Sequence, residues 1–216
     1  MNFVVVQRLR LITPQKSIMN TPQTFIFFGR SGSGKGTQAR LLVKKLTETN
    51  SHEVLYLETG KKFREFMESD SHTAELTKEV INDGGLLPEF LPVWMWTDYL
   101  VKNADGTKHI ILDGIARHVD EARVLDGALK FYNREKPFVI NINMSRERAT
   151  ELMKGRGRAD DTDEDIAKRH DWYDTDVVPA IEYFKNSSDY VFFDIDGEQS
   201  IEEVQAEIFN AVSNSK

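Results

Sequence analysis

The chain has 216 residues and no cysteine, so it has neither disulfide bonds nor thiolate metal sites. Its five histidines are scattered and form no metal-binding motif. No stretch approaches the roughly 18 consecutive apolar residues that a membrane helix needs. An excess of basic residues is also lacking, because the formal net charge is −7. This balance argues against a general nucleic-acid or anionic-membrane binder, whose affinity depends on a basic face. We expect a cytoplasmic, monomeric, globular protein.

Acidic residues are absent from the first 20 positions, which carry Arg8, Arg10 and Lys16. We predict that residues 1–23 are a disordered leader or an upstream extension, with Met19 as an alternative start. An organelle presequence is the other interpretation of this segment, although its apolar stretch is too short for a secretory signal. Residues 24–216 have the length and composition of a single domain with a substantial core.

A glycine-rich stretch, residues 29–37, stands between an apolar run and a helical pattern that begins near Lys35. Glycines in this context let successive backbone N–H groups surround a polyphosphate, while the helix dipole and one lysine supply positive charge. The stretch therefore predicts a site for a nucleoside triphosphate. Its predicted ATP-binding residues are Gly29, Gly32, Ser33, Gly34, Lys35, Gly36 and Thr37.

Short apolar runs alternate with helical patterns along the rest of the chain. The predicted strands are Thr24–Gly29, Glu53–Leu57, His109–Asp113, Pro137–Asn143 and Tyr190–Asp194. Nearly continuous apolar strands separated by helices predict an α/β fold of the P-loop NTPase type, a doubly wound five-stranded parallel sheet with helices on both faces. In such sheets ligands bind at the carboxyl ends of the strands.

Two segments interrupt this alternation and predict small flaps over the ligand end of the sheet. The first, about 58–88, is helical, and the second, about 153–165, begins at a Gly/Arg-rich turn. We expect Trp94, Met95 and Trp96 to fill the underside of the first flap. The spacing of Thr162 and Asp165, and of Ser200 and Glu203, predicts helix caps. The final helix should bury one face formed by Ile201, Val204, Ile208 and Val212.

Arginines follow several of the predicted strands, as phosphoryl transfer requires, because cations must hold the donor, the acceptor and the developing charge in line. A guanidinium group also binds phosphate oxygens in a fixed, bidentate geometry. With the lysine of the glycine-rich loop, these arginines are the predicted catalytic residues: Lys35, Arg117, Arg156, Arg158 and Arg169.

Taken together, these motifs resemble the adenylate kinases of the nucleoside monophosphate kinase family, in their short-lid form. The matching segments are residues 32–38, Thr59-Gly60 with Arg64, Gly84 with Leu86-Leu87, Leu112-Asp113-Gly114 with Arg117, and Arg156 to Asp161 with Arg169 and Tyr173. The resemblance implies reversible, Mg²⁺-dependent transfer of the γ-phosphoryl group of ATP to a nucleoside monophosphate.

The resemblance also implies roles for individual residues. Asp113 would organise water around Mg²⁺. Thr37 is the other implied metal ligand, one residue after the usual Ser/Thr position, which Gly36 occupies. Asp160 and Asp161 would pair with arginines as the lid closes. The implied acceptor-binding residues are Thr59, Gly60, Arg64, Leu87, Gly114, Arg117 and Glu121.

Three positions depart from the family pattern. Ile115-Ala116 replaces Phe-Pro, so the loop that carries Arg117 loses a ring-locked φ and is expected to be looser. Leu152 replaces an arginine that stacks on the donor adenine. Glu121 replaces a glutamine that reads the acceptor base, and an ionised carboxylate only accepts hydrogen bonds.

These departures leave the function open between several interpretations. AMP is the favoured acceptor, with GMP or another monophosphate as the alternative because guanine presents two adjacent donors to Glu121. A kinase for a small hydroxyl acceptor and a nucleotide-binding regulator without turnover are further alternatives.

Overall fold

The computed structural model describes residues 21–49, 52–158 and 161–215. The strands form one parallel five-stranded sheet in the order β2-β3-β1-β4-β5. Their bounds are β1 Thr24–Gly29, β2 Val54–Glu58, β3 His109–Asp113, β4 Phe138–Asn143 and β5 Val191–Asp196. Strands β2 and β3 lie on one side of the central strand β1, and β4 and β5 lie on the other. The direction in which successive strands are added therefore reverses beside β1. Such a reversal opens a crevice at the carboxyl ends of the strands.

Helices connect the strands throughout the described part of the chain. Their bounds are α1 Lys35–Thr49, α2 Thr59–Phe66, α3 His72–Asn82, α4 Phe90–Asn103, α5 Val119–Phe131, α6 Arg146–Arg156, α7 Asp163–Trp172, α8 Val178–Lys185 and α9 Ile201–Asn214. A short π-helix, η1, covers Tyr173–Val177 between α7 and α8.

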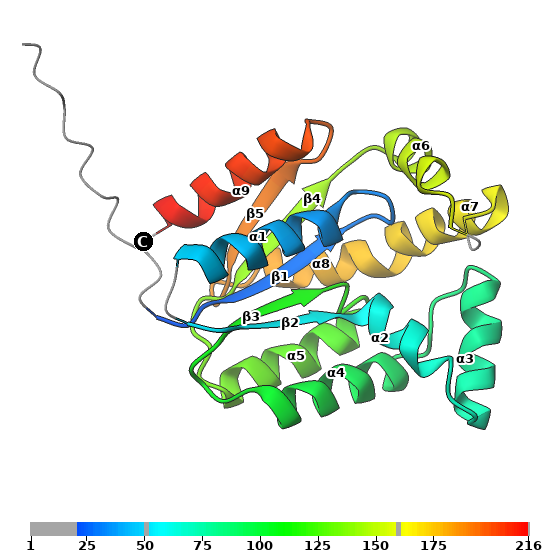
Figure 1. The fold of residues 1–216 in the computed structure, drawn as a ribbon, viewed down its shortest axis with the longest axis horizontal. Helices are drawn as coiled ribbons and strands as arrows, with labels where there is room; N and C mark the ends of the chain where they lie inside the picture. The colour runs from blue at the N-terminus through cyan, green and yellow to red at the C-terminus, as the bar shows by residue number, and fades with distance from the viewer. Residues whose placement is uncertain (1–20, 50–51, 159–160, 216) are drawn as a thin grey trace, which may run out of the picture.

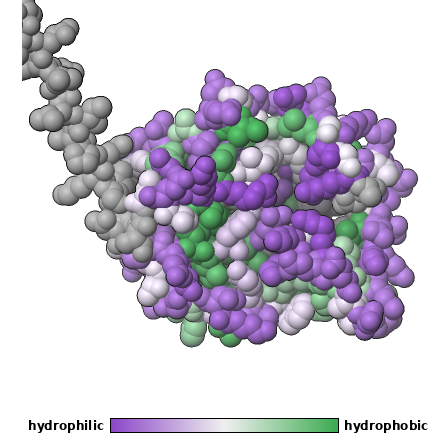
Figure 2. Space-filling view, in the orientation of Figure 1, coloured by the Kyte–Doolittle hydropathy of each residue, from purple (hydrophilic) through white to green (hydrophobic). Residues whose placement is uncertain are grey.

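The core consists of two layers on opposite faces of the sheet. Alternation along β1 directs Phe25 and Phe27 toward α1 and α9, and directs Ile26 and Phe28 toward α4, α5 and α8. Each face of the sheet is therefore buried under helices, which explains why its strands are almost continuously apolar. Figure 2 shows that hydrophilic side chains cover most of one face of the molecule, with hydrophobic ones gathered over β2 below α1.

Two helical segments lie beyond the carboxyl ends of the strands (Figure 1). Helices α2 and α3 form the predicted first flap, which has its own apolar cluster: Phe63, Phe66, Val80, Ile81, Leu87, Leu91 and Met95. Helices α6 and α7 flank the predicted lid. Both segments thus face the ligand end of the sheet, as the sequence predicts.

The predicted fold class is confirmed, and each observed strand agrees with a predicted one to within two residues at either end. The two predicted caps are also present, because the Thr162 side chain accepts a hydrogen bond from the Asp165 amide and Ser200 forms a capping box with Glu203. Most of the expected leader, residues 1–20, lies outside the described residues.

Two packing predictions are wrong in part. Ile201 is 53% exposed, because it is the first residue of α9 and lies at the rim of the sheet's ligand end. Trp94 is 49% exposed, and its ring contacts Phe66 of the flap edge to face. Met95 does pack in the flap cluster, but Trp96 is buried in the main core, so α4 joins the flap to the sheet.

Candidate active site

A single large cavity of about 980 Å³ opens at the carboxyl ends of β1, β2 and β3. It is lined on one side by the loop between β1 and α1, on another by the flap, and on a third by α6 and α7. The predicted catalytic, ATP-binding and acceptor-binding residues all line this cavity except Gly29, which borders a small cavity that shares Ser31, Lys35 and Arg117 with it. Segments far apart in the sequence therefore meet around one space.

The loop between β1 and α1 adopts a conformation that its glycines make accessible. Gly32 has φ +91°, and a Cβ atom there would lie 2.4 Å from the carbonyl oxygen of Ala149 in α6. No other residue fits this position without displacing α6. The loop thereby lies against α6 and lines the cavity, and among the described residues the buried Ser33 hydroxyl has no hydrogen-bond partner.

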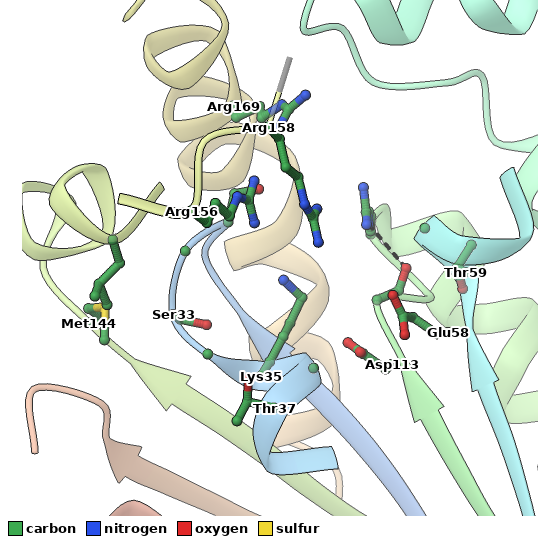
Figure 3. A pocket seen from close by; sticks show the side chains of 18 of the residues that line it. Ser33, Lys35, Thr37, Glu58, Thr59, Asp113, Met144, Arg156, Arg158 and Arg169 are labelled. Carbon is green, nitrogen blue, oxygen red and sulfur yellow. Dashed lines mark hydrogen bonds between the residues drawn. The ribbon is translucent and has the colours of Figure 1, made fainter. Parts of the chain in front are cut away.

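Lys35 begins α1 and points into the cavity (Figure 3). Burial lowers the pKa of Lys35 to about 8, against the opposing attraction of Asp113. Its Nζ atom lies 3.5 Å from the carbonyl oxygen of Arg30. A buried ammonium group with so little compensation from the protein is suited to an anionic ligand, which would restore its ionised form.

Asp113 ends β3 beside the first turn of α1. It accepts a hydrogen bond of 3.2 Å from the Tyr56 hydroxyl, and burial raises its pKa while Lys35 lowers it. A Cβ atom at Gly36 would lie 3.0 Å from the Asp113 Oδ2 atom. Close approach of this carboxylate to the helix thus explains glycine at position 36. In Figure 3, Thr37 and Asp113 lie on different sides of the first turn of α1.

The lid-side arginines lie above Lys35 in Figure 3. Arg156 donates two hydrogen bonds to Asp161, with donor–acceptor distances of 2.5 and 2.7 Å, and Arg169 donates another of 3.1 Å. The Asp161 side chain is 1% exposed, so it holds both guanidinium groups from inside the lid. The expected partner Asp160 lies outside the described residues, and Arg158 lines the cavity with them.

Arg117 contacts both its own loop, which lacks proline, and α7. Its Nε atom donates to the Gly114 carbonyl oxygen at 3.1 Å, and its guanidinium carbon lies 5.5 Å from the centre of the Trp172 ring. Ala116 is fully buried and has φ +53°, a value that a proline ring does not permit. The loop is therefore packed with a different backbone from the one that Phe-Pro would impose, and its expected looseness stays a prediction.

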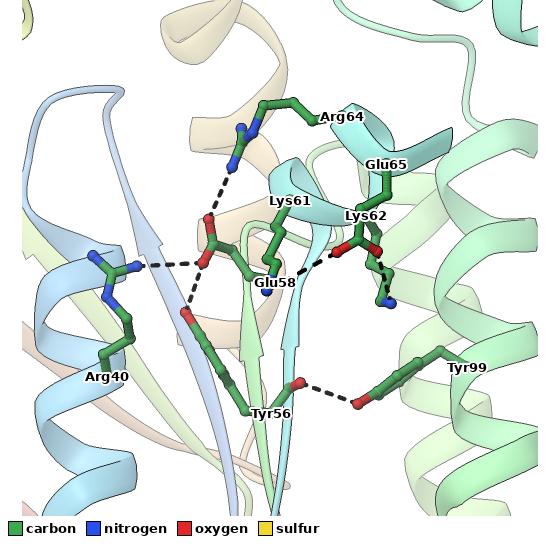
Figure 4. A network of polar contacts seen from close by, with 8 residues as sticks. All are labelled: Arg40, Tyr56, Glu58, Lys61, Lys62, Arg64, Glu65 and Tyr99. Carbon is green, nitrogen blue, oxygen red and sulfur yellow. Dashed lines mark hydrogen bonds and ion pairs between the residues drawn. The ribbon is translucent and has the colours of Figure 1, made fainter. Parts of the chain in front are cut away.

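Glu58, at the end of β2, organises a polar network that the sequence analysis missed (Figure 4). Its carboxylate accepts hydrogen bonds from Arg40 at 3.3 Å and from Arg64 at 3.2 Å. Tyr56 lies between the two acidic groups of this region, since its hydroxyl is 3.4 Å from Glu58 and 3.2 Å from Asp113. A charged residue directly after a buried strand was the signal that could have identified Glu58.

The flap side of the cavity is apolar apart from a few buried polar atoms. Thr59 is buried and its hydroxyl has no partner within the described part of the chain, while Leu87 belongs to the flap cluster. Glu121, in the first turn of α5, is also buried, and no described side chain or backbone group forms a hydrogen bond of ordinary geometry with its carboxyl oxygens. Unpaired polar atoms that line a cavity suit a ligand with complementary polar groups.

The flap and α7 are joined where the predicted Gly84 segment ends the flap. The indole nitrogen of Trp172 donates to the Gly84 carbonyl oxygen at 3.1 Å, and Lys168 donates to that of Asp83 at 3.0 Å. The Arg117 guanidinium group also lies over the Trp172 ring. This residue, which the sequence analysis did not identify, links the flap, α7 and the loop after β3 that carries Arg117.

Within the described ranges, no group of three or more acidic, histidine or cysteine side chains could hold a metal ion. Mg²⁺ does not need such a cage, because it is commonly bound by one or two carboxylates together with substrate phosphates and water. The buried Asp113 carboxylate beside Lys35 and the glycine-rich loop fits that mode of binding.

Comparison with known proteins identifies similar sequences over most of the chain. Residues 27–189 match the family model described as "Adenylate kinase". The "Adenylate kinase" of Mycobacterium tuberculosis is 34% identical over 161 residues, which cover 74% of this chain and 85% of that protein. That of Prochlorococcus marinus is 33% identical over 171 residues, or 79% and 89% of the two chains. That of Oenococcus oeni is 30% identical over 196 residues, or 89% and 98%.

Proposed function

The chain belongs to the adenylate kinase family, and on this basis we propose that it transfers the γ-phosphoryl group of ATP to AMP in a reversible, Mg²⁺-dependent reaction. Membership of the family makes it a nucleoside monophosphate kinase, which phosphorylates nucleoside monophosphates with ATP. The alternatives of a regulator without turnover and of a kinase for hydroxyl acceptors are thereby set aside.

One observation supports the proposal most directly: a lysine and several arginines from distant parts of the chain line the same cavity. So many cations repel one another, and burial lowers the pKa of both Lys35 and Arg117. Such an arrangement is unfavourable unless anions neutralise it, and two facing nucleotides carry the required charge.

On the donor side, the backbone of residues 29–34 and the Lys35 ammonium group would bind the ATP phosphates. Arg156, Arg158 and Arg169 are proposed to neutralise the charge that spreads over the transferred phosphoryl group. Asp161 accepts hydrogen bonds from the guanidinium groups of Arg156 and Arg169. These two side chains would therefore lose little conformational freedom when substrate binds.

On the acceptor side, Arg64 and Arg117 would bind the phosphate of the monophosphate. An oxygen of that phosphate forms a bond to the γ-phosphorus as the bond from that phosphorus to the bridging β-oxygen breaks. Because the attacking oxygen already carries negative charge, no general base is required, and alignment by the cations provides the catalysis.

When bound, Mg²⁺ would neutralise part of the charge on the donor phosphates. Asp113 is proposed to hold it through water, since the carboxylate is adjacent to Lys35 and to the start of α1. Thr37 lines the cavity, and its role as a metal ligand stays a prediction.

GMP is a second candidate acceptor, and Glu121 is the observation that favours it. Guanine presents two adjacent donors, N1–H and the 2-amino group, that match an ionised carboxylate. Adenine presents one donor and one acceptor. An ionised carboxylate can accept a hydrogen bond from the donor but cannot donate one to the acceptor. The Glu121 side chain lines the proposed acceptor part of the cavity, and its two oxygens have no hydrogen-bond partner among the residues that the structure describes.

Replacing Lys35 by methionine, or Arg117 by alanine, tests the proposal. Each change removes a cation that stabilises the transition state, so kcat/KM for Mg·ATP and AMP should fall by about 10²- to 10³-fold. Lys44→Met and Arg123→Ala are matched controls, because these side chains are exposed on α1 and α5 and should leave kcat/KM within about twofold of the wild type. Wild-type activity in either site variant would refute the assigned roles.

The cytoplasmic location and the monomeric state stay predictions. Among the residues that the structure describes, none of the helices is both long and apolar enough to span a membrane.

A further inference from the structure

Trp172, the last residue of α7, contacts two parts of the cavity wall that lie far apart in the sequence. Its indole nitrogen donates a hydrogen bond of 3.1 Å to the carbonyl oxygen of Gly84, at the end of the flap. The centre of its ring lies 5.5 Å from the guanidinium carbon of Arg117, which follows β3. Trp172 also lines the large cavity, so both contacts are made at the site itself.

One face of α7 packs against the turn at which the flap ends. Asp165, Lys168 and Trp172 are spaced three and four residues apart, which places them on the same side of the helix. Lys168 donates to the Asp83 carbonyl oxygen at 3.0 Å. A Cβ atom at Gly84 would lie 3.0 Å from the Cα atom of Asp165, so glycine allows the turn to approach the helix. The indole hydrogen bond thus attaches the Trp172 ring to a turn that already lies against α7.

Arg117 combines burial with a neighbour that does not occupy its hydrogen-bond donors. Burial lowers the pKa of Arg117, and the carboxyl groups of Glu121 and Asp113 oppose this shift. Its Nε atom donates to the Gly114 carbonyl oxygen at 3.1 Å, which leaves the two terminal nitrogens to be considered. A carboxylate paired with these nitrogens would compete with a phosphate group for them, whereas an aromatic face attracts the cation without accepting its N–H groups. Trp172 can therefore orient this guanidinium group and leave its donors for an anion.

We infer that Trp172 is a positioning residue for the acceptor phosphate: its ring orients the Arg117 guanidinium group, and its hydrogen bond to Gly84 aligns that group with the flap. The inference rests on the proposed function, in which Arg117 binds the phosphate of the monophosphate. It assigns to one side chain the relative placement of the flap, which forms a wall of the cavity, and of the cation that would bind the phosphate.

A purely structural role for Trp172 is the alternative explanation. The ring is partly buried and packs against the main core, so its removal would weaken the protein even if Arg117 did not depend on it. Lys168 helps to separate the two explanations. It binds the same flap turn as Trp172 and forms an ion pair with Glu164 on its own helix, but it has no contact with Arg117 in the described structure.

The test uses steady-state kinetics at saturating Mg·ATP, with whichever of AMP and GMP the wild type phosphorylates faster. Trp172→Leu removes both the ring and the N–H donor, so kcat/KM for the monophosphate should fall about tenfold, as expected for a partly desolvated cation–π contact. Trp172→Phe keeps an aromatic face but has no donor for Gly84, so the fall should be about threefold. KM for Mg·ATP should change by less than about twofold in both variants.

A double-mutant cycle with Arg117→Ala provides a readout that a purely structural role would not change. Once the guanidinium group is absent, Trp172 has nothing to orient, so adding Trp172→Leu should lower kcat/KM for the monophosphate by less than about twofold. Two single variants serve as controls. Lys168→Met removes the other side-chain bond to the flap turn, and Trp94→Leu removes an aromatic ring that is 49% exposed on α4. Both should retain kcat/KM within about twofold of the wild type.

The inference is supported if kcat/KM falls about tenfold in Trp172→Leu and this fall largely disappears in the Arg117→Ala background. An equal fall in both backgrounds, a fall that Lys168→Met reproduces, or an unchanged kcat/KM in Trp172→Leu overturns the inference and leaves the proposed function intact. If circular dichroism shows that Trp172→Leu does not fold, the same cycle with Trp172→Phe gives the decision. Wild-type protein that phosphorylates no nucleoside monophosphate would instead remove the proposed function.

Discussion

Replacing Glu121 by glutamine should change how the stability of the free protein depends on pH. Burial raises the pKa of this carboxyl group from 4.5 to about 7, so the folded protein binds its proton more tightly than the unfolded chain does. The stability that accompanies the neutral form is fully present below about pH 4.5 and is lost as the pH rises through about pH 7. Glutamine is neutral at every pH and shows no such loss.

The size of the effect follows from the two pKa values. A difference between 4.5 and about 7 corresponds to about 3.5 kcal/mol of unfolding free energy at full ionisation, at about 1.4 kcal/mol per pKa unit. Between about pH 5 and about pH 8 the wild type should therefore lose about 2.5 kcal/mol relative to Glu121→Gln. Such a change is a large part of the stability of a typical domain.

Urea unfolding of both proteins at the two pH values, without nucleotides, measures this difference. Asp120→Asn is the matched control, because this neighbouring carboxylate is exposed on the same helix turn and pairs only with Arg123 in the described structure. Its stability difference from the wild type should change by less than about 0.5 kcal/mol over the same range. A difference between wild type and Glu121→Gln that does not grow with pH would refute the inference of a carboxyl group buried in its neutral form.

Two further predictions concern the walls of the cavity. Glu58→Gln removes the charge that positions Arg64, so KM for the acceptor should rise about three- to tenfold in steady-state kinetics. The unfolding free energy should change by less than about 1 kcal/mol, and an unchanged KM would contradict the positioning role. Gly36→Ala places a methyl group 3.0 Å from the Asp113 carboxylate and should lower kcat at least about tenfold. Gly127→Ala, in open space on α5, should instead raise the unfolding free energy by about 0.5 to 1 kcal/mol at unchanged kcat, and equal kinetic effects of both glycine changes would refute this account.

Local patterns in the sequence were sufficient for much of the fold. The strand β3, Ile110-Ile111-Leu112 in its centre, is buried on both faces, and only a parallel sheet covered by helices accommodates such a run. The cap at Ser200 was equally predictable, because its geometry depends on Glu203 three residues away and on nothing distant.

Predictions that depended on the surroundings of a helix were less successful. Ile201 falls on the apolar face of α9, but the sheet ends beneath it, and helical periodicity contains no information about where a neighbouring element stops. Trp94 and Trp96 are two residues apart in one helix, so they point in different directions, and only the packed structure shows which of them enters the core.

The candidate site shows the same division. The glycine-rich loop and the arginines could be identified because their residue types and local spacing follow from the chemistry of phosphate binding. Glu58 itself follows a predicted strand, but its partners could not be identified, because Arg40, Tyr56 and Arg64 reach it from three elements. The behaviour of Ala116 was also hidden, since a backbone angle of +53° at a buried alanine depends on the packing around it.

By itself, the sequence determined the sheet, the phosphate-binding loop and the class of reaction, because each of these depends on residues close together in the chain or on a motif of fixed spacing. The tertiary structure alone decided the electrostatic state of the site. Burial and neighbours from other elements set the pKa values of Lys35, Asp113 and Glu121. The energy of a charge depends on everything within several ångströms of it, and that environment exists only after distant segments have packed together.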